Sequence, residues 1–146
     1  MRAPHLAGFS LALATVVVAA LGVAADEPSA INIVEFRTWV SGDKGVVRCG
    51  LFDERGWLTK PIRSATAKIQ GKSALCTFQR VPPGTLAASA FHDENSNGKL
   101  DTNFLGMPTE EYCASRNARG TFGPPSFDKS KFGYGGGTKR IEAHMK

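Results

Sequence analysis

The sequence lacks the patterns by which several classes of protein are recognised. No long segment places apolar residues at the i, i+3, i+4, i+7 spacing of an amphipathic helix, which argues against a helical bundle. Nothing recurs at a fixed period, which argues against a solenoid. The three cysteines do not have zinc-site spacing, and no serine or cysteine stands in a recognised nucleophile motif. These absences leave a β-rich or irregular domain as the expectation.

The first 25 residues are typical of a secretory signal peptide. Arg2 gives a positive start, residues 11–23 form an apolar run, and small residues end the segment at Ala25. A retained membrane anchor is the alternative, but the run is shorter than the roughly 18 apolar residues of a span. Removing 25 of the 146 residues leaves 121, so residues 26–146 are predicted to form one periplasmic or extracellular domain without a transmembrane segment.

The charge of the chain is mildly basic and dispersed. The whole sequence carries 18 Lys and Arg against 13 Asp and Glu, and loss of Arg2 reduces its net charge from +5 to +4. This balance favours acidic partners such as anionic lipid or another cell-envelope component, although a solvated surface is the simpler interpretation. Because aromatic residues do not alternate with the basic ones, no nucleic-acid partner is expected.

Three cysteines lie in the predicted mature chain. Cys49 and Cys76 each stand inside an apolar run typical of a strand, whereas Cys113 stands in a polar segment that is expected to be a loop. Because disulfides persist outside the cytoplasm, we predict a Cys49–Cys76 bridge and a leftover Cys113, as a free thiol or with an intermolecular partner. The alternative is that all three are reduced and that the first two pack in the core.

The mature chain is predicted to be mostly β. Short runs with apolar residues or period-two alternation are separated by clusters of glycine, proline, asparagine and aspartate. The expected strands cover residues 31–40, 46–52, 66–70, 73–81, 85–91 and 138–145. No strand is expected from 92 to 127, and so long an irregular segment in a small domain tends to be functional or tied down. The fold class is therefore all-β, a single β-sandwich with a long irregular loop segment.

One stretch of this irregular segment has the spacing of a calcium-binding loop. Oxygen-bearing groups alternate along it and an acid ends the run, so the candidate ligands are Asp93, Asn95, Asn97, the Lys99 carbonyl and Asp101. The twelfth position, where such loops place a bidentate glutamate, is Phe104, which cannot ligate, so weak binding is expected. The alternative is a metal-free turn, because Asn and Asp bond local backbone groups and Asn-Gly favours tight turns.

Several segments together resemble domain of unknown function family 2141, a group of uncharacterised secreted bacterial proteins. They are residues 46–52, 81–85, 91–103, 106–110 and 123–127. The resemblance implies a secreted single domain with a transthyretin-like or immunoglobulin-like β-sandwich, and it implies no activity. The family's Tyr-Gly-Phe-Ser-Asn segment is replaced at residues 112–117 by Tyr-Cys-Ala-Ser-Arg-Asn. The Pro-Pro-Gly-Thr turn and the calcium-type loop also resemble those of transthyretin-like adhesin repeats.

These observations favour a secreted or periplasmic binding or structural module whose functional edge is the segment 92–127. The alternative is a hydrolase-like enzyme of the cell envelope, in which His92 acts as a base beside Asp93. A third hypothesis is an adhesin-like interaction module. A polar pocket around His92 would favour the enzyme, whereas a flat, exposed face would favour interaction.

Overall fold

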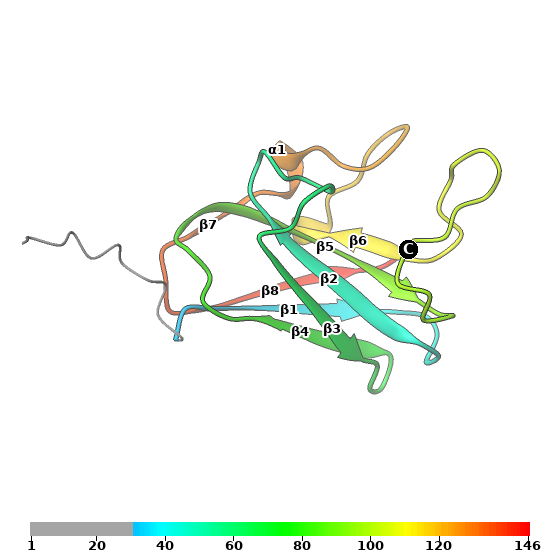
Figure 1. The fold of residues 1–146 in the computed structure, drawn as a ribbon, viewed down its shortest axis with the longest axis horizontal. Coiled ribbons are helices and arrows are strands. Elements are labelled where there is room, and N and C mark those ends of the chain that lie inside the picture. The colour runs from blue at the N-terminus through cyan, green and yellow to red at the C-terminus, as the bar shows by residue number, and fades with distance from the viewer. Residues whose placement is uncertain (1–30) are drawn as a thin grey trace, which may run out of the picture.

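The structure is a computed structural model that describes residues 31–146, so the predicted signal peptide, residues 1–25, lies outside the described residues (Figure 1). Its strands are β1 (Ile33–Trp39), β2 (Val46–Phe52), β3 (Arg63–Lys68), β4 (Ser73–Phe78), β5 (Gly84–Asp93), β6 (Tyr112–Ala114), β7 (Phe132–Tyr134) and β8 (Thr138–His144). A 3-10 turn, Ser115–Asn117, follows β6, and a four-residue helix, α1 (Phe127–Ser130), precedes β7. Within the described part of the chain, no helix has the length and apolar character needed to cross a membrane. The predicted all-β fold is confirmed.

The strands form two sheets of different size. In the first sheet the order is β4-β1-β8, with β1 antiparallel to β4 and parallel to β8. In the second sheet the order is β3-β2-β5-β6, and every pairing is antiparallel. The ten-residue strand β5 also pairs with β7 at its start, whereas β6 pairs near its end. The end of β5 is therefore the point from which the long segment leaves the sheet (Figure 1).

The core lies between the sheets and follows from strand alternation. Successive side chains of a strand point to opposite faces, and accordingly β1 buries Val34 and Phe36 while β2 buries Leu51. A disulfide between Cys49 and Cys76 joins β2 in one sheet to β4 in the other, with 6.4 Å between the Cα atoms. The predicted bridge is therefore confirmed, and it links the inner faces of the two sheets.

Cys113 shows where the strand prediction is wrong. The sequence predicts a polar loop here, but Cys113 is a fully buried residue of β6, opposite Ala90 of β5. Both β6 and β7 have only three residues, too few to show a periodic pattern, and each forms because it pairs with β5. Cys113 is a free thiol, and burial raises its pKa to about 12, so the thiol is poorly reactive.

The segment after β6, residues 115–117, lies where the chain departs from the family pattern. Its side chains bond to β5, α1 and β8. The Ser115 hydroxyl accepts the backbone amide of Ala88 in β5 at 2.9 Å and donates to the Ser130 carbonyl of α1 at 2.6 Å. Asn117 Oδ1 accepts the backbone amide of His144 in β8 at 2.8 Å. These contacts give the segment a structural role at the edge of both sheets.

Candidate functional site

The segment that joins β5 to β6 contains the predicted calcium loop and extends beyond the end of the sheet. In Figure 1 it is the yellow-green loop beside β5 and β6. We call residues 93–101 the anchored turn and residues 102–109 the apolar tip. The two parts differ in chemistry, because charged and amide side chains fill the first and uncharged side chains fill the second.

Asp93, the last residue of β5, holds the anchored turn to the sheet. Its fully buried carboxylate accepts the backbone amides of Asn97 and Gly98, each at 2.9 Å. Arg48 on β2 donates its Nε–H to the same carboxylate at 2.5 Å. Gly98 has a φ of +88°, a region that favours glycine, and a Cβ there would lie 3.7 Å from Arg48 Nη2. Asp93 is therefore a buried charge that is paired with Arg48, and both of its carboxylate oxygens accept hydrogen bonds.

The surroundings of Asp93 hold the pKa of its carboxyl below the ordinary value of 3.8. Burial by itself disfavours the charged form and raises this pKa. The hydrogen bonds from Arg48, Gly98 and Asn97, together with the positive charge of Arg48, outweigh that effect. Asp93 is thus ionised at neutral pH, with Arg48 as its counter-ion.

The other predicted calcium ligands bond to one another and to the backbone of the turn. The side-chain amides of Asn95 and Asn97 donate to the Asp101 carboxylate at 2.7 and 2.8 Å. Asn95 Oδ1 accepts the backbone amide of Asn97 at 3.1 Å, and Asn97 Oδ1 accepts that of Lys99 at 3.0 Å. The structure therefore brings the predicted residues into one turn but directs the side-chain oxygens of Asn95, Asn97 and Asp101 toward N–H groups.

As described, the turn is held by hydrogen bonds and by the ion pair between Arg48 and Asp93. Calcium takes about 6–8 oxygen ligands, whereas here Arg48 supplies the positive charge beside Asp93 and two amide nitrogens face Asp101. Only two of the predicted ligands, Asp93 and Asp101, are carboxylates, and the others are amide and carbonyl oxygens. Calcium binding stays a prediction from the sequence.

His92 precedes the anchored turn and is enclosed by its neighbours. Its side chain is fully buried, with Nε2 2.6 Å from the Lys44 carbonyl oxygen and Nδ1 3.7 Å from Glu111 Oε2. Glu111 accepts the backbone amide of Ser41 at 2.9 Å and also its hydroxyl. The serine hydroxyl therefore bonds to the glutamate and not to the histidine, which is not the order of a nucleophile relay. Because Ser41 and Glu111 are 70 positions apart, no local motif could have revealed this cluster.

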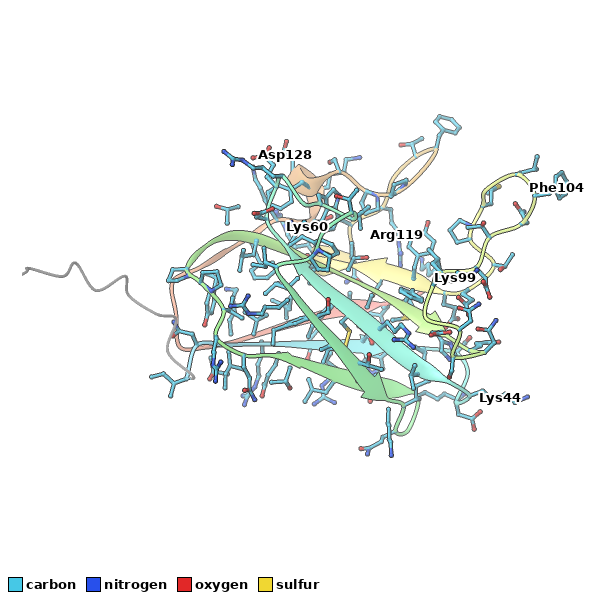
Figure 2. All side chains as sticks on the ribbon, in the orientation of Figure 1. Lys44, Lys60, Lys99, Phe104, Arg119 and Asp128 are labelled. Atoms are coloured by element: carbon cyan, nitrogen blue, oxygen red, sulfur yellow. A yellow bond between two sulfur atoms is a disulfide. The ribbon has the colours of Figure 1, made fainter. Side chains whose placement is uncertain are left out.

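The apolar tip presents three large apolar side chains to solvent. Phe104 is 95% exposed, Leu105 69% and Met107 61%. Asn103 shapes the turn beneath them, because its Oδ1 accepts the backbone amides of Leu105 at 2.9 Å and Met107 at 3.1 Å. Figure 2 shows Phe104 at the outer end of the loop. Sequence reasoning identified Phe104 only as a residue that cannot ligate calcium and missed the exposed group.

Glu110 closes the base of the apolar tip. Its Oε1 accepts the backbone amide of Glu94 and its Oε2 accepts that of Asp101, both at 3.0 Å. The Thr109 amide also donates to the Asp101 carbonyl oxygen at 2.9 Å. These bonds tie the outgoing and returning halves of the segment together, so the tip stands on a fixed base.

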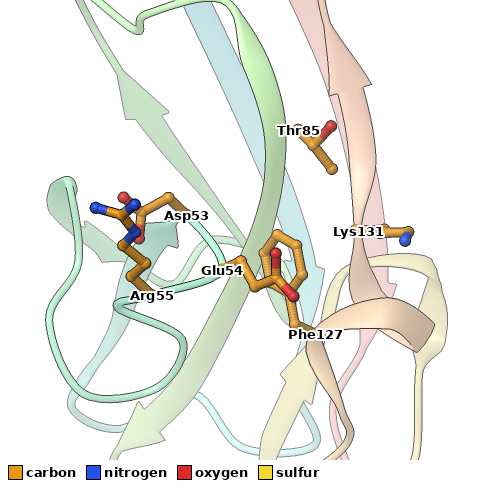
Figure 3. A pocket seen from close by; sticks show the side chains of 6 residues that line it. All are labelled: Asp53, Glu54, Arg55, Thr85, Phe127 and Lys131. Carbon is orange, nitrogen blue, oxygen red and sulfur yellow. The ribbon is translucent and has the colours of Figure 1, made fainter.

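A polar hollow lies at the opposite end of β5. It has a volume of about 440 Å³ and is lined by Asp53, Glu54, Arg55, Thr85, Phe127 and Lys131 (Figure 3). Its charges are of both signs, and two of them have partners already: Asp53 accepts the Gly56 amide, and Lys131 pairs with Asp128 at 2.5 Å. The arrangement favours no particular class of ligand.

We expect the free energy of unfolding to fall as the pH drops below about 4.5. Burial raises the pKa of Glu111, but hydrogen bonds from Ser41 and the charge of His92 bring it below its ordinary value of 4.5, and the pKa of Asp93 also lies below 3.8. A carboxyl whose folded pKa is lowered stabilises the fold above its unfolded pKa, and this stabilisation is lost as the pH falls through the folded pKa.

Urea denaturation at several pH values between about 3 and 7 measures this dependence. Glu111→Gln removes one of the two groups and should make the curve shallower on the acid side. Equal slopes for the variant and the parent protein would show that Glu111 does not contribute.

The fold and the site together define an all-β domain of two disulfide-linked sheets that carries a tied loop with an exposed apolar end. The chain belongs to the family described as uncharacterized protein conserved in bacteria (DUF2141), whose family model matches residues 38–142. The resemblance seen in the sequence is thereby confirmed. A search of the curated proteins found no match, and neither did a search of the solved structures. The family description names no activity, so a function has to be inferred from the site.

Proposed function

We propose that this protein is a secreted or periplasmic binding module and that the apolar tip is its contact surface. A transthyretin-like or immunoglobulin-like β-sandwich is the proposed scaffold, supported by two sheets whose inner faces are joined by a disulfide. The predicted signal peptide and the disulfide support a place outside the cytoplasm. The observation that carries the proposal is the exposure of Phe104, Leu105 and Met107 on one preformed turn.

The energetics of the tip favour a partner that covers it. Single exposed apolar side chains are common on protein surfaces, but three on one turn form a patch. Fully burying a Phe, Leu or Met side chain is worth about 1.5–3 kcal/mol. Because Asn103 already fixes the turn, little conformational entropy would be lost on binding.

The enzyme alternative draws less support. A general base has to come within hydrogen-bond reach of the substrate, yet His92 and Asp93 are both fully buried. The adhesin-like hypothesis is compatible with the proposal, because an adhesin module is one kind of module that binds through an exposed surface. It differs only in requiring a cell-surface partner.

Photo-crosslinking in the native bacterial envelope tests the proposal. We expect p-benzoylphenylalanine in place of Phe104 to form adducts on irradiation, because the tip would be covered by its partner. The matched control is the same residue in place of Leu75, which is 41% exposed on β4 and far from the tip in sequence. Equal yields at the two positions, or no adduct at 104, would remove the tip as the contact surface.

We also propose that Arg48, and not calcium, holds the anchored turn. A ligand that binds only the folded state at about ten times its Kd adds about 1.4 kcal/mol of stability. Because Arg48 already neutralises Asp93, we expect thermal melts in millimolar calcium, in magnesium and in chelator to coincide. A rise in melting temperature that is specific to calcium and is lost in Asp101→Asn would restore the calcium site predicted from the sequence.

A further inference from the structure

We infer that the partner of the apolar tip is the surface of a lipid bilayer with zwitterionic headgroups. This inference rests on the proposed binding function and names the class of partner for the same surface. It is carried by three properties of the tip: the absence of charge, the internal bonding of the amides of residues 105–109, and the acidic character of its base.

The tip is free of charged side chains over eight consecutive positions. Residues 102–109 read Thr-Asn-Phe-Leu-Gly-Met-Pro-Thr. Transfer of a charged side chain from water to an apolar medium has the largest desolvation cost of any side chain. Because the tip has no charged side chain, its insertion into a bilayer avoids this cost. The exposed Phe104, Leu105 and Met107 are the side chains that would enter the acyl region.

Most backbone amides of the tip are bonded within the loop, whereas the amide of Phe104 has no partner among the described residues. A segment that enters a bilayer has to satisfy its own amides, because the hydrocarbon offers no acceptor. The amides of residues 105–109 are accounted for within the loop: Leu105 and Met107 donate to Asn103 Oδ1, Gly106 donates to the Asn103 carbonyl, Thr109 donates to the Asp101 carbonyl, and Pro108 has no N–H.

The same bonding reduces the number of hydrogen bonds that a protein groove could make with the tip. Protein interfaces combine apolar contact with directional hydrogen bonds, typically one per 100–200 Å². The amide donors of residues 105–109 are already used inside the turn, so a groove could bond only to carbonyl oxygens there and would otherwise rely on apolar contact. A bilayer offers mainly apolar contact, and helices that lie in a membrane interface bury their apolar face about 5–10 Å into the boundary between headgroups and acyl chains.

The base of the tip determines which lipids it suits. Glu110 bonds the backbone of Glu94 and of Asp101 at this base. The basic residue of the anchored turn is Lys99, which Figure 2 shows below the loop. Attraction to anionic lipid needs a cluster of about 4–8 Lys or Arg, and the base has an excess of acid instead. Binding should therefore be driven by apolar contact, favour zwitterionic lipid and depend little on salt.

Vesicle flotation of the purified, disulfide-bonded protein is the test. We expect the protein to float with phosphatidylcholine vesicles, with no gain from added phosphatidylglycerol and no loss in high salt. Phe104→Ser should lower the partition coefficient by about tenfold or more, because it removes the apolar side chain that the bilayer would bury. Leu75→Ser, which removes exposed apolar area on β4, should leave it unchanged.

A fluorescence measurement checks the site of insertion. The emission of Phe104→Trp should shift to the blue with vesicles and be quenched by brominated lipid, whereas Leu75→Trp should show neither effect. Because both positions are solvent-exposed, the variants should keep the parent's urea midpoint, which confirms that they are folded.

The outcomes separate this inference from the proposed function. No flotation together with protein adducts at position 104 would overturn the bilayer as partner and leave the binding module intact. No flotation and no adduct at 104 would overturn both. Flotation that requires phosphatidylglycerol, disappears in salt and ignores Phe104→Ser would overturn insertion of the tip and assign membrane contact to basic side chains elsewhere.

Discussion

Replacing both Cys49 and Cys76 by alanine is expected to lower the free energy of unfolding by about 3–4 kcal/mol. The bridge closes a loop with a sequence separation of 27 and joins β2 to β4 across the two sheets. Opening it enlarges the unfolded ensemble, and for a loop of this length chain entropy accounts for about 3.5 kcal/mol. That is a large part of the roughly 5–15 kcal/mol by which a small domain is stable.

Urea denaturation with and without dithiothreitol measures this contribution. Reductant should destabilise the parent protein by a similar amount and leave the double variant unchanged. A thiol assay gives an independent count, because unfolding should expose one thiol, that of Cys113, without reductant and three with it. A parent protein indifferent to reductant would show that the bridge adds no stability.

Arg48→Met is expected to cost about 2–3 kcal/mol. It leaves the Asp93 carboxylate buried with two backbone amides but without its counter-ion at 2.5 Å. Removing one partner of a fully buried pair typically costs about 3–5 kcal/mol. We expect less here because the Arg48 side chain is 35% exposed, so water already screens part of the interaction.

A double-mutant cycle with Asp93→Asn isolates the pair. If the charges interact as the geometry indicates, Arg48→Met combined with Asp93→Asn should cost less than the sum of the single variants. Full additivity at neutral pH would show that Arg48 stabilises the fold through packing alone. The effect of Arg48→Met should also shrink in acid, because protonation of Asp93 removes the charge that Arg48 neutralises.

The anchored turn supports the apolar tip and fixes its position on the domain. Arg48 and Asp93 fix the turn to two neighbouring strands of the larger sheet, and Glu110 clamps the two halves of the segment above it. A loosely held loop could fold its apolar side chains back onto the protein. Because the base is fixed, Phe104 stays outside, where a bilayer could cover it (Figure 2).

Local pattern was sufficient for the strands that are long enough to display it. The run from 46 to 52 was predicted with the bounds that β2 has, because its apolar residues are bordered by turn clusters on both sides. The Cys49–Cys76 bridge followed from two cysteines in strand-like runs and a predicted secretory signal. The turn at 93–101 could also be recognised, because alternating Asp and Asn with a glycine at 98 is a local signal.

The sequence by itself therefore determined the β class, the longer strands, the disulfide and the place of the turn, since each depends on residues close in the chain or on composition. Tertiary structure alone decided that Cys113 is buried in β6 and that Arg48 neutralises Asp93 from 45 positions away. It also decided which apolar side chains stay outside, as Phe104 does. Burial and charge pairing depend on which strands become neighbours in the folded domain. A local sequence pattern does not specify those neighbours, because they are distant in the chain.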